Sequence, residues 1–416
     1  MAELRTVRIG DLGRIVTGKT PPSSQPGLFG ELYPFLTPTD IDGFARYIEP
    51  ARFLSPEGRD YQHRLMLPER AVCVVCIGAT IGKVCMTSRP SFTNQQINSI
   101  IVKEDEHDPF YVYHLMTTLR DELKSNAGGA ATPIINKSAF SEIEVQVPSL
   151  AVQQRIAGIL SAYDELIENS QRRIKILESM ARALYREWFV NFRFPGHESV
   201  PRVPSPLGEI PQGWEVKALA DVCSRITDGS HFSPQSVEDG YPMASVKDMH
   251  DWGINIEGCR RITSDDYENL VRNDCKPLKN DVLIAKDGSY LKHTFVVGEE
   301  QDLVILSSIA MLRPNDAIRP NYLCFTLQHP VTKSRMKGIV SGVAIPRIVL
   351  KDFRKFQILV PPDGVQADWA RLVDPMVEMC RKLVAQTENL CSTRDLLLPH
   401  LLSGSVALNN STEAIS

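Results

Sequence analysis

The sequence predicts an α+β protein in which two similar globular α/β domains are separated by a pair of long antiparallel coiled-coil helices. Three observations predict this. The chain runs twice through the same order of motifs, with a period of roughly 210 residues, as a pseudo-twofold internal repeat. Each copy ends in a long segment with heptad-like apolar spacing. A proline-rich segment, 195–213, separates the first long segment from the second copy and is typical of a semi-rigid linker.

The repeat can be followed motif by motif. Ile9–Leu12 corresponds to Leu219–Val222, and Asp11 matches Asp221 inside these segments. Segments 142–148 and 355–361 alternate apolar and polar residues with period two, as half-buried strands do. The further matched segments are 33–35 with 241–243, 71–78 with 281–288, 111–115 with 322–326, and 133–140 with 346–353.

A long helix is predicted to close each copy, with Ser149 and Asp363 as N-cap residues. Pro375 should kink or interrupt the second helix near Val373. Helices of about 50 Å would result at 1.5 Å per residue. They could pack on each other, or each could pack only on its own domain; the length of the apolar stripes favours pairing. The stripes are Val152, Ile156, Ile159, Tyr163, Leu166, Leu177, Met180 and Leu184, then Trp369, Val373, Met376, Cys380, Leu383, Leu390, Leu397 and Leu401, the second broken by Thr387 and Arg394.

These patterns divide the chain into six parts. They are a first domain (1–148), a first long helix (149–194), the linker (195–213), a second domain (214–362), a second long helix (363–404) and a C-terminal tail (405–416).

The bulk composition is that of an ordinary globular protein. Of 416 residues, 43% are hydrophobic and 23% charged, and the net charge is −4. The polar N-terminus and the lack of a run of roughly 18 apolar residues indicate a cytoplasmic protein. The nine cysteines show no framework and are expected to be free thiols. Cys73 and Cys76, with only Cys85 nearby, are interpreted as core residues rather than zinc ligands.

Positive charge is concentrated locally. Segment 333–355 contains seven basic residues and one acidic residue, Asp352. Such a segment is either a solvated surface or a source of phosphate contacts.

No enzyme motif stands in a suitable context. Residues 13–20 match the phosphate-loop pattern GxxxxGK[ST]. However, Pro21 and Pro22 follow at once and oppose the helix that such a loop requires, and the second copy has Asp228-Gly229-Ser230 at the matching place. The Pro-Pro pairs lack the flanks of an adenine methylase motif. The duplicated chain is therefore predicted to be a two-headed binder without a catalytic site, metal or cofactor.

Four segments carry a specific resemblance. Segments 147–164 and 183–192, the opening 210–215 with Leu219–Val222, and the ending 397–404 resemble specificity subunits of type I restriction–modification systems. The resemblance spans nearly the whole chain, and its parts follow the order of the repeat. One departure is segment 365–369, which keeps Gln366 but lacks the Gln-Arg-Ile found at 154–156.

The resemblance implies a function and a set of partners. Each globular domain would be a target recognition domain that reads one half of a bipartite DNA sequence, and the helices would set the spacer. Two modification (methyltransferase) subunits that bind S-adenosylmethionine would dock on the chain, and restriction (motor/nuclease) subunits that use ATP would join them. The alternatives are a stand-alone protein-binding scaffold or regulator and, from the pattern at 13–20, a phosphate-loop NTPase.

Candidate DNA-binding residues in the first domain are polar side chains on loops. The amides could pair with adenine, or they could bond locally to the backbone of a turn. They are Lys19, Thr20 and Ser23; Asn94, Gln95, Gln96 and Asn98; and Lys83, Thr132 and Lys137.

In the second domain, the repeat indicates the corresponding places. His231 could instead be a surface or capping histidine. The candidates are Ser230, His231, Lys286, Ser289, Lys292, Ser307, Ser308, Arg347 and Lys351.

Polar residues of the long helices are candidates for partner binding, or else form a solvated face. They are Gln153, Gln154, Arg155, Arg172, Arg173, Lys175 and Gln366.

Overall fold

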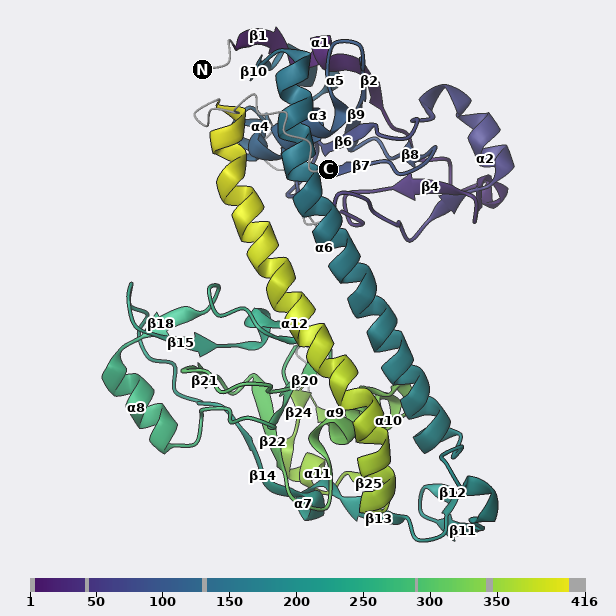
Figure 1. Cartoon of the computed structure of the whole chain (residues 1–416), viewed down its shortest axis with the longest axis vertical. Helices are drawn as coiled ribbons and strands as arrows, with labels where there is room; N and C mark the ends of the chain where they lie inside the picture. The colour runs from purple at the N-terminus through teal and green to yellow at the C-terminus, as the bar shows by residue number, and fades with distance from the viewer. Residues whose placement is uncertain (1–3, 42–44, 129–132, 289–290, 342–346, 404–416) are drawn as a thin grey trace, which may run out of the picture. The chain divides into compact units, whose positions relative to one another are not determined.

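A computed structural model of the chain describes residues 4–41, 45–128, 133–288, 291–341 and 347–403. The chain divides into two compact units (Figure 1). Unit 1 comprises residues 1–170 and 387–416, and unit 2 comprises residues 171–386. The boundary crosses both long helices, so each unit contains one half of each helix. Among the described helices, none combines the length and apolar character that crossing a bilayer requires.

The helices and strands of the first copy include the strand predicted at 142–148 and the long helix predicted to follow it. They are β1 (Arg5–Arg8), α1 (Ile9–Leu12), β2 (Gly13–Thr17), β3 (Phe29–Gly30), β4 (Tyr33–Leu36), β5 (Phe53–Leu54), α2 (Pro56–Tyr61), β6 (Val72–Val75), β7 (Val84–Met86), β8 (Phe92–Thr93), β9 (Ile97–Val102), α3 (Pro109–Thr118), α4 (Arg120–Ser125), α5 (Lys137–Glu142), β10 (Glu144–Val147) and α6 (Leu150–Tyr185).

The second copy repeats this order, with small additions around its second sheet. Its elements are β13 (Glu215–Ala218), α7 (Leu219–Val222), β14 (Cys223–Asp228), β15 (Tyr241–Ala244), β16 (Met249–His250), β17 (Gly253–Ile254), β18 (Arg260–Ile262), α8 (Ser264–Arg272), β19 (Val282–Ala285), β20 (Thr294–Val296), β21 (Val304–Ile305), β22 (Ile309–Pro314), α9 (Pro320–Gln328), α10 (Pro330–Met336), β23 (Val340–Ser341), β24 (Arg347–Ile348), α11 (Leu350–Arg354), β25 (Gln357–Val360) and α12 (Asp363–Leu402).

The two copies share one sheet topology, which confirms the predicted repeat. Each has a four-stranded antiparallel sheet, in the order β2-β9-β6-β7 in the first copy and β14-β22-β19-β20 in the second. Each has a second sheet that contains one parallel pair, β4 with β8 and β15 with β21. Each also joins its first and last strands, β1 with β10 and β13 with β25.

Both faces of the four-stranded sheet are covered, which explains why its interior strand β6 is apolar throughout. In β6, Val72 and Val74 pack into the core that contains α3 and the start of α6. Cys73 and Val75 point to the other face, into the core shared with Leu36 of β4. Strand β19 is divided in the same way between two cores. Cys73 therefore serves packing, and burial raises the pKa of the Cys76 thiol to about 11.

The linker is more ordered than a proline-rich spacer requires. Strand β11 (Arg202–Ser205) pairs with β12 (Gly208–Pro211) as an antiparallel hairpin. Ile210 and Trp214 are buried in the core of unit 2 together with Trp188 and Phe189. The Trp188 and Phe189 side chains belong to a π-helical turn, Arg186–Val190, that follows α6.

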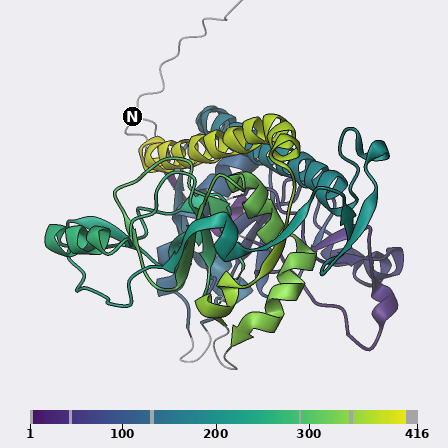
Figure 2. The ribbon, with the colours of Figure 1, turned by 90° about the horizontal axis from the view of Figure 1, so that it is seen from below.

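The two long helices pair with each other, as the apolar stripes predict. They lie side by side in both ribbon views (Figures 1 and 2). In unit 1 the first half of α6 meets the end of α12, where Asp164 contacts Arg394. In unit 2 the second half of α6 meets the first half of α12, where the Cys380 thiol lies 3.8 Å from the Ile174 carbonyl oxygen. The pairing is therefore antiparallel.

Two details of the helices differ from the predictions. Helix α12 is continuous through Pro375, so the predicted interruption does not occur. The carbonyl of Ser149 accepts the backbone N–H groups of the first turn of α6, and the carbonyl of Pro362 does the same in α12. Pro362 thus matches Ser149, and the predicted cap, Asp363, is already the first helical residue.

The buried face of α6 is also displaced from the predicted stripe. Ile159, Leu166 and Met180 were expected in the seam but are exposed. The face that is buried in unit 1 includes Gln153 and Asp164 instead. Because two residues of the buried face are polar, the apolar spacing of the sequence predicted a neighbouring row of α6 residues as the buried face. The stripe of α12 is closer to the prediction, with Trp369, Val373, Cys380, Leu383 and Leu401 buried.

The core of unit 2 is centred on Trp369, which is fully buried and contacts Phe189, Phe325 and Tyr322 edge-on. We expect Trp369→Ala to lower the free energy of unfolding by about 3–5 kcal/mol, because it leaves a large cavity. Denaturant unfolding followed by circular dichroism measures this.

The matched control for this prediction is Leu372→Ala, on the same helix but 47% exposed. It should change the free energy by about 0.5 kcal/mol or less. Equal effects of the two substitutions would contradict the central position of Trp369.

Candidate nucleic-acid interface

The sheet topology brings the candidate residues of the first domain to one edge. Since neighbouring strands are antiparallel, β2 and β6 end where β9 and β7 begin. In the register of these strands, Thr17 lies opposite Asn98, and Val75 lies opposite Ile97. We call the segments 18–20, 76–83 and 94–96 at this end of the sheet the loop edge of unit 1. Lys19, Thr20, Lys83 and the amides 94–96 all lie on it.

The amide side chains of this loop edge are bonded to one another and to hydroxyl groups. The Thr20 hydroxyl donates to the Gln95 amide oxygen at 2.7 Å. The Asn94 amide nitrogen donates to the Gln96 amide oxygen at 2.9 Å, and the Asn94 oxygen accepts the Gln96 backbone N–H. Asn94 is buried and shapes the turn, whereas Gln95 is exposed and Gln96 is half-buried.

Asn98 has a structural role here, in contrast to the prediction for it. It is 2% exposed, and its amide oxygen accepts a 2.7 Å hydrogen bond from the Thr17 hydroxyl of the paired strand. This pair stabilises β2 against β9 and leaves the amide no surface from which to reach a base.

The remaining first-domain candidates lie on or beside the loop edge. Lys19 and Ser23 are exposed, and the Lys19 backbone donates to Thr93. The Lys83 ammonium donates to the carbonyl of Ile41, so it is tied to the fold. Lys137 is exposed at the start of α5, which follows a segment that bonds Gly78 to Pro133. Thr132 lies outside the described residues.

Unit 2 has the same edge at the same place. Strands β14 and β19 end, and β22 and β20 begin, at one end of the sheet. We call the segments 229–231, 286–288, 291–293 and 306–308 the loop edge of unit 2. It carries Ser230, His231, Lys286, Lys292, Ser307 and Ser308. Ser289 lies outside the described residues.

An ion-paired group dominates this second loop edge. Lys286 is buried, and its ammonium lies 2.7 Å from the Asp228 carboxylate. His231 is 75% exposed, and its Nε2 lies 3.3 Å from the same carboxylate. Lys286 therefore neutralises Asp228 within the fold, while His231 extends from it towards solvent.

The serines here serve turns, and two basic residues complete the edge. The Ser230 hydroxyl accepts the Phe232 backbone N–H at 3.0 Å, and the Ser308 hydroxyl accepts that of Val246 at 3.1 Å. Arg347 is exposed and forms a bridge with Asp287, which places it on the loop edge. Lys351 is exposed on α11, the helix that follows.

Gln153 and Gln366 were predicted to contact partners, but the structure gives both another role. They are 0% and 1% exposed. Gln153 accepts the Asp108 backbone N–H at 3.1 Å and donates to the Pro148 carbonyl at 2.9 Å. Gln366 accepts the Arg319 N–H at 3.0 Å and donates to the Pro361 carbonyl at 2.8 Å. Each glutamine fastens its long helix to the start of α3 or α9.

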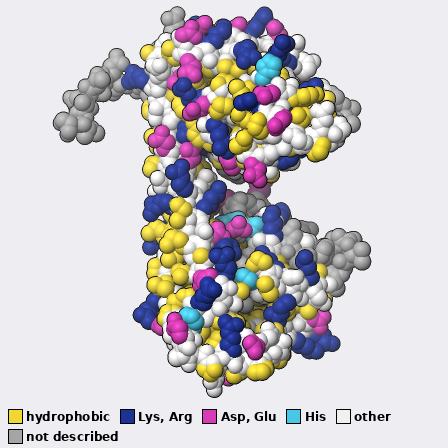
Figure 3. Space-filling view, turned by 90° about the vertical axis from the view of Figure 1, so that its right-hand side faces the viewer, with side chains coloured by type: hydrophobic (Ala, Val, Ile, Leu, Met, Phe, Trp, Pro, Cys, Tyr) yellow, Lys and Arg dark blue, Asp and Glu magenta, His cyan; other side chains and the backbone are white. Residues whose placement is uncertain are grey.

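The other helix candidates are on the surface. They are the exposed side chains Gln154, Arg155, Arg172, Arg173 and Lys175 of α6. On the face in Figure 3, basic and acidic side chains are mixed over both units, in keeping with the net charge of −4.

The phosphate-loop pattern at 13–20 does not form a phosphate loop. Residues Gly13–Thr17 are strand β2, and no helix begins after Thr20 until the short turn Pro26–Leu28. The backbone of Lys19 is bonded to Thr93 rather than wrapped as an anion cradle. Among the described residues, no group of three or more His, Cys, Asp or Glu side chains could hold a metal ion.

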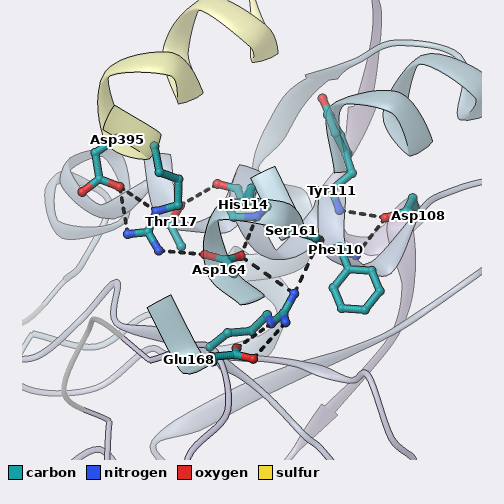
Figure 4. Close-up of polar contacts among 11 residues, drawn as sticks. Asp108, Phe110, Tyr111, His114, Thr117, Ser161, Asp164, Glu168 and Asp395 are labelled. Atoms are coloured by element: carbon teal, nitrogen blue, oxygen red, sulfur yellow. Dashed lines mark hydrogen bonds and ion pairs between the residues drawn. The ribbon is translucent and has the colours of Figure 1, made fainter. Parts of the chain in front are cut away.

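Sequence reasoning missed a buried charge cluster where the two long helices meet in unit 1 (Figure 4). Asp164 of α6 is 2% exposed, and its carboxylate lies 2.8 Å from Arg394 of α12 and 3.1 Å from His114 of α3. Arg46 bonds Glu168 through two nitrogens, at 3.0 and 3.2 Å. The only signal in the sequence is that Arg394 breaks an apolar stripe.

Burial disfavours the charged form of Asp164, but His114 and Arg394 outweigh it and hold the pKa of Asp164 below its ordinary value. Burial lowers the pKa of Arg394, but the Asp164 and Asp395 carboxylates outweigh burial and raise this pKa above its ordinary value. The repeat provides a comparison, because the corresponding positions in unit 2 are the apolar Val377, Ala181 and Phe325. Charge at this seam is thus a property of unit 1 and not of the shared fold.

Comparison with known proteins gives a consistent result. The family model described as "Type I restriction modification DNA specificity domain" matches residues 1–179 and 211–390. The specificity subunit of the type I restriction enzyme MjaIX from Methanocaldococcus jannaschii is 28% identical over 405 residues, covering 95% of this chain and 92% of that protein. The HindI specificity subunit of Haemophilus influenzae is 36% identical over 178 residues, covering 41% of this chain and 38% of that protein.

A solved structure shares the fold. The crystal structure of a type I restriction–modification S subunit from M. genitalium superposes with a TM-score of 0.58 at 16% identity, and the match covers 96% of both chains.

The buried charge cluster makes a stability prediction. Arg394→Ala should lower the free energy of unfolding by about 3–5 kcal/mol, because it leaves the Asp164 charge buried with less compensation. The control is Arg371→Ala, an exposed arginine of α12 paired with Asp368, which should cost about 0–1 kcal/mol. Denaturant unfolding of both variants compares them, and equal costs would contradict the role given to Asp164.

The cluster also makes a pH prediction. Since the folded pKa of Asp164 is lowered, its stabilisation is complete above the unfolded value of about 3.9 and is lost as pH falls through the folded pKa. Asp164→Asn should therefore lose stability at neutral pH and show a weaker further loss below pH ~4. Unfolding midpoints across this range test it; an unchanged acid dependence in the variant would be inconsistent with a lowered pKa.

Proposed function

Because the chain belongs to the family of type I restriction–modification DNA specificity domains, we propose that it is the specificity subunit of such a complex. In this role it selects the DNA sequence that the complex modifies or cuts. One observation carries the proposal: the family model matches twice, once over each copy of the structural repeat.

In the proposed division of work, each domain reads one half of a bipartite target. The two loop edges support this because they occupy the same place in one topology but carry different side chains. A shared framework with different surface groups is what reading two different half-sites requires. The paired helices join the two readers and set the unread spacer.

The long helices are also the proposed docking surface for two modification subunits. Both helices expose large apolar side chains, which mark protein contact surfaces when they gather on one element. Exposed polar groups of α6, including Gln154, Arg155 and Arg172, lie on the same helix. The apolar side chains are Ile159, Leu166, Ile176 and Met180 on α6, and Leu372, Met379 and Leu396 on α12.

The chemistry of the complex is assigned to its partners. The modification subunits would bind S-adenosylmethionine, and the restriction subunits that join them would use ATP. This chain would contribute no catalytic group and no cofactor site, and it would act in the cytoplasm. The strand conformation of Gly13–Thr17 supports the assignment of nucleotide binding elsewhere.

Methylation mapping tests the proposal directly. Adenine methylation would be mapped across the genome of a host with and without this gene, and again after the gene is restored. A bipartite methylated motif should disappear on deletion and return on complementation, because only this chain supplies the sequence choice.

The companion modification subunit must be expressed in all three strains, which immunoblotting checks. If the motif persists without this gene, the specificity role is wrong. If no motif depends on the gene and the chain still copurifies with other proteins, the stand-alone scaffold is the better reading. A gel shift with the modification subunit present, on selected against random DNA, provides an independent measurement.

A further inference from the structure

The two loop edges differ in the chemistry that they offer to a DNA base. In unit 1 the loop edge offers the exposed amide of Gln95 and the half-buried Gln96 and Thr20, together with the exposed cation Lys19. In unit 2 they are cations, led by Arg347, Lys292 and His231. The four-stranded sheets beneath the two edges share one topology, so the difference lies in the side chains and in the short strand β24 (Arg347–Ile348) that carries Arg347.

The amides of unit 1 are held in a defined orientation. The Gln95 oxygen accepts from the Thr20 hydroxyl, and the Gln96 oxygen accepts from Asn94. Each fixed oxygen keeps a second lone pair, and each amide nitrogen keeps its two donors. The Gln96 amide nitrogen lies beside Gly78, where an added Cβ would stand 3.8 Å from it, an ordinary van der Waals distance. Gln95 is the exposed member and is therefore the one that can reach a base.

An amide that offers one acceptor and one donor side by side matches adenine, whose N6 donates and whose N7 accepts in the major groove. No other base presents this pair in the same order. Because Thr20 restrains the Gln95 side chain before binding, less conformational entropy is lost when the base contact forms.

The second loop edge is suited to a different base. Arg347 is exposed, and its backbone pairs with that of Asp287. The backbone N–H of the next residue, Ile348, donates to the Lys286 carbonyl. A guanidinium donates two parallel hydrogen bonds, which match the O6 and N7 acceptors of guanine. The carboxylate of Asp287, the residue bridged to Arg347, lies 3.8 Å from the ammonium of buried Lys286.

We infer that the two half-sites differ in base chemistry: unit 1 reads an adenine through Gln95, and unit 2 reads a guanine through Arg347. This inference rests on the proposed function, because it assumes that the loop edges face DNA. It adds the identity of one base pair in each half-site.

The experiment maps the methylated motif produced by the complete complex, this chain with its modification subunits, on a plasmid library with randomised half-sites. Gln95→Glu replaces the amide donor with a carboxylate, which accepts from cytosine instead of pairing with adenine. Arg347→Gln removes the guanidinium. Each change should reduce discrimination at one position by roughly 5- to 150-fold.

The expected result has two parts. Gln95→Glu should relax or alter an A·T position in one half-site only, and Arg347→Gln should relax a G·C position in the other half-site only. The controls are Gln212→Glu and Arg272→Gln, exposed side chains on the linker hairpin and on α8, which should leave the motif unchanged. Unfolding midpoints confirm that the variants are folded.

The inference is overturned if Gln95→Glu leaves every A·T position intact, or if Arg347→Gln leaves every G·C position intact, while the wild-type chain still directs a bipartite motif. Absence of any motif with the wild-type chain would instead count against the proposed function. Where a variant methylates too weakly to map, gel shifts of the complex on duplexes changed one base pair at a time supply the same comparison.

Discussion

The structure depends on one constraint: the hydrophobic core of each unit is completed by side chains from the long helix of the other copy of the repeat. Leu398 and Leu401 at the end of α12 are buried in the core of unit 1. Ala181 and Tyr185 at the end of α6 are buried in the core of unit 2. Each domain therefore packs against half of the long helix that belongs to the other copy. Burying these side chains supplies the free energy that holds the helices in antiparallel register, since helix propensity alone stabilises such segments weakly.

The two units stabilise the contact between the long helices by different interactions. Unit 2 uses close aromatic packing around Trp369 and Tyr185. Unit 1 places Asp164 and Arg394 where unit 2 has Val377 and Ala181. A buried ion pair costs desolvation energy that apolar packing avoids, so it contributes less net stability than the packing that it replaces. Its stronger effect is that mispairing would leave a charge buried without a partner, which makes the register of α12 on unit 1 more specific.

With the frame fixed in this way, the loop edges are free to differ. Strand pairing fixes where Gln95, Lys286 and Arg347 lie, because antiparallel neighbours must turn at the same edge. The side chains of Gln95 and Arg347 are exposed and contribute little to the cores, so they can change without loss of the fold. This separation of frame and surface is the physical basis for a protein that keeps one architecture and reads two different half-sites.

The sequence alone determined the two-copy plan, the strand that ends each domain and the two long helices, because periodicity is a local property of the chain. Most of the candidate DNA-binding residues that it named lie on the loop edges, since they follow strands. Tertiary structure decided the rest. The sequence predicts Gln153 and Gln366 on the surface, but both are buried. Gln153 accepts a hydrogen bond from the backbone N–H of Asp108, and Gln366 accepts one from that of Arg319. Asp164 is buried because Arg394 reaches it from 230 residues away. Whether a polar side chain faces solvent or a partner depends on such distant contacts, and no local pattern records them.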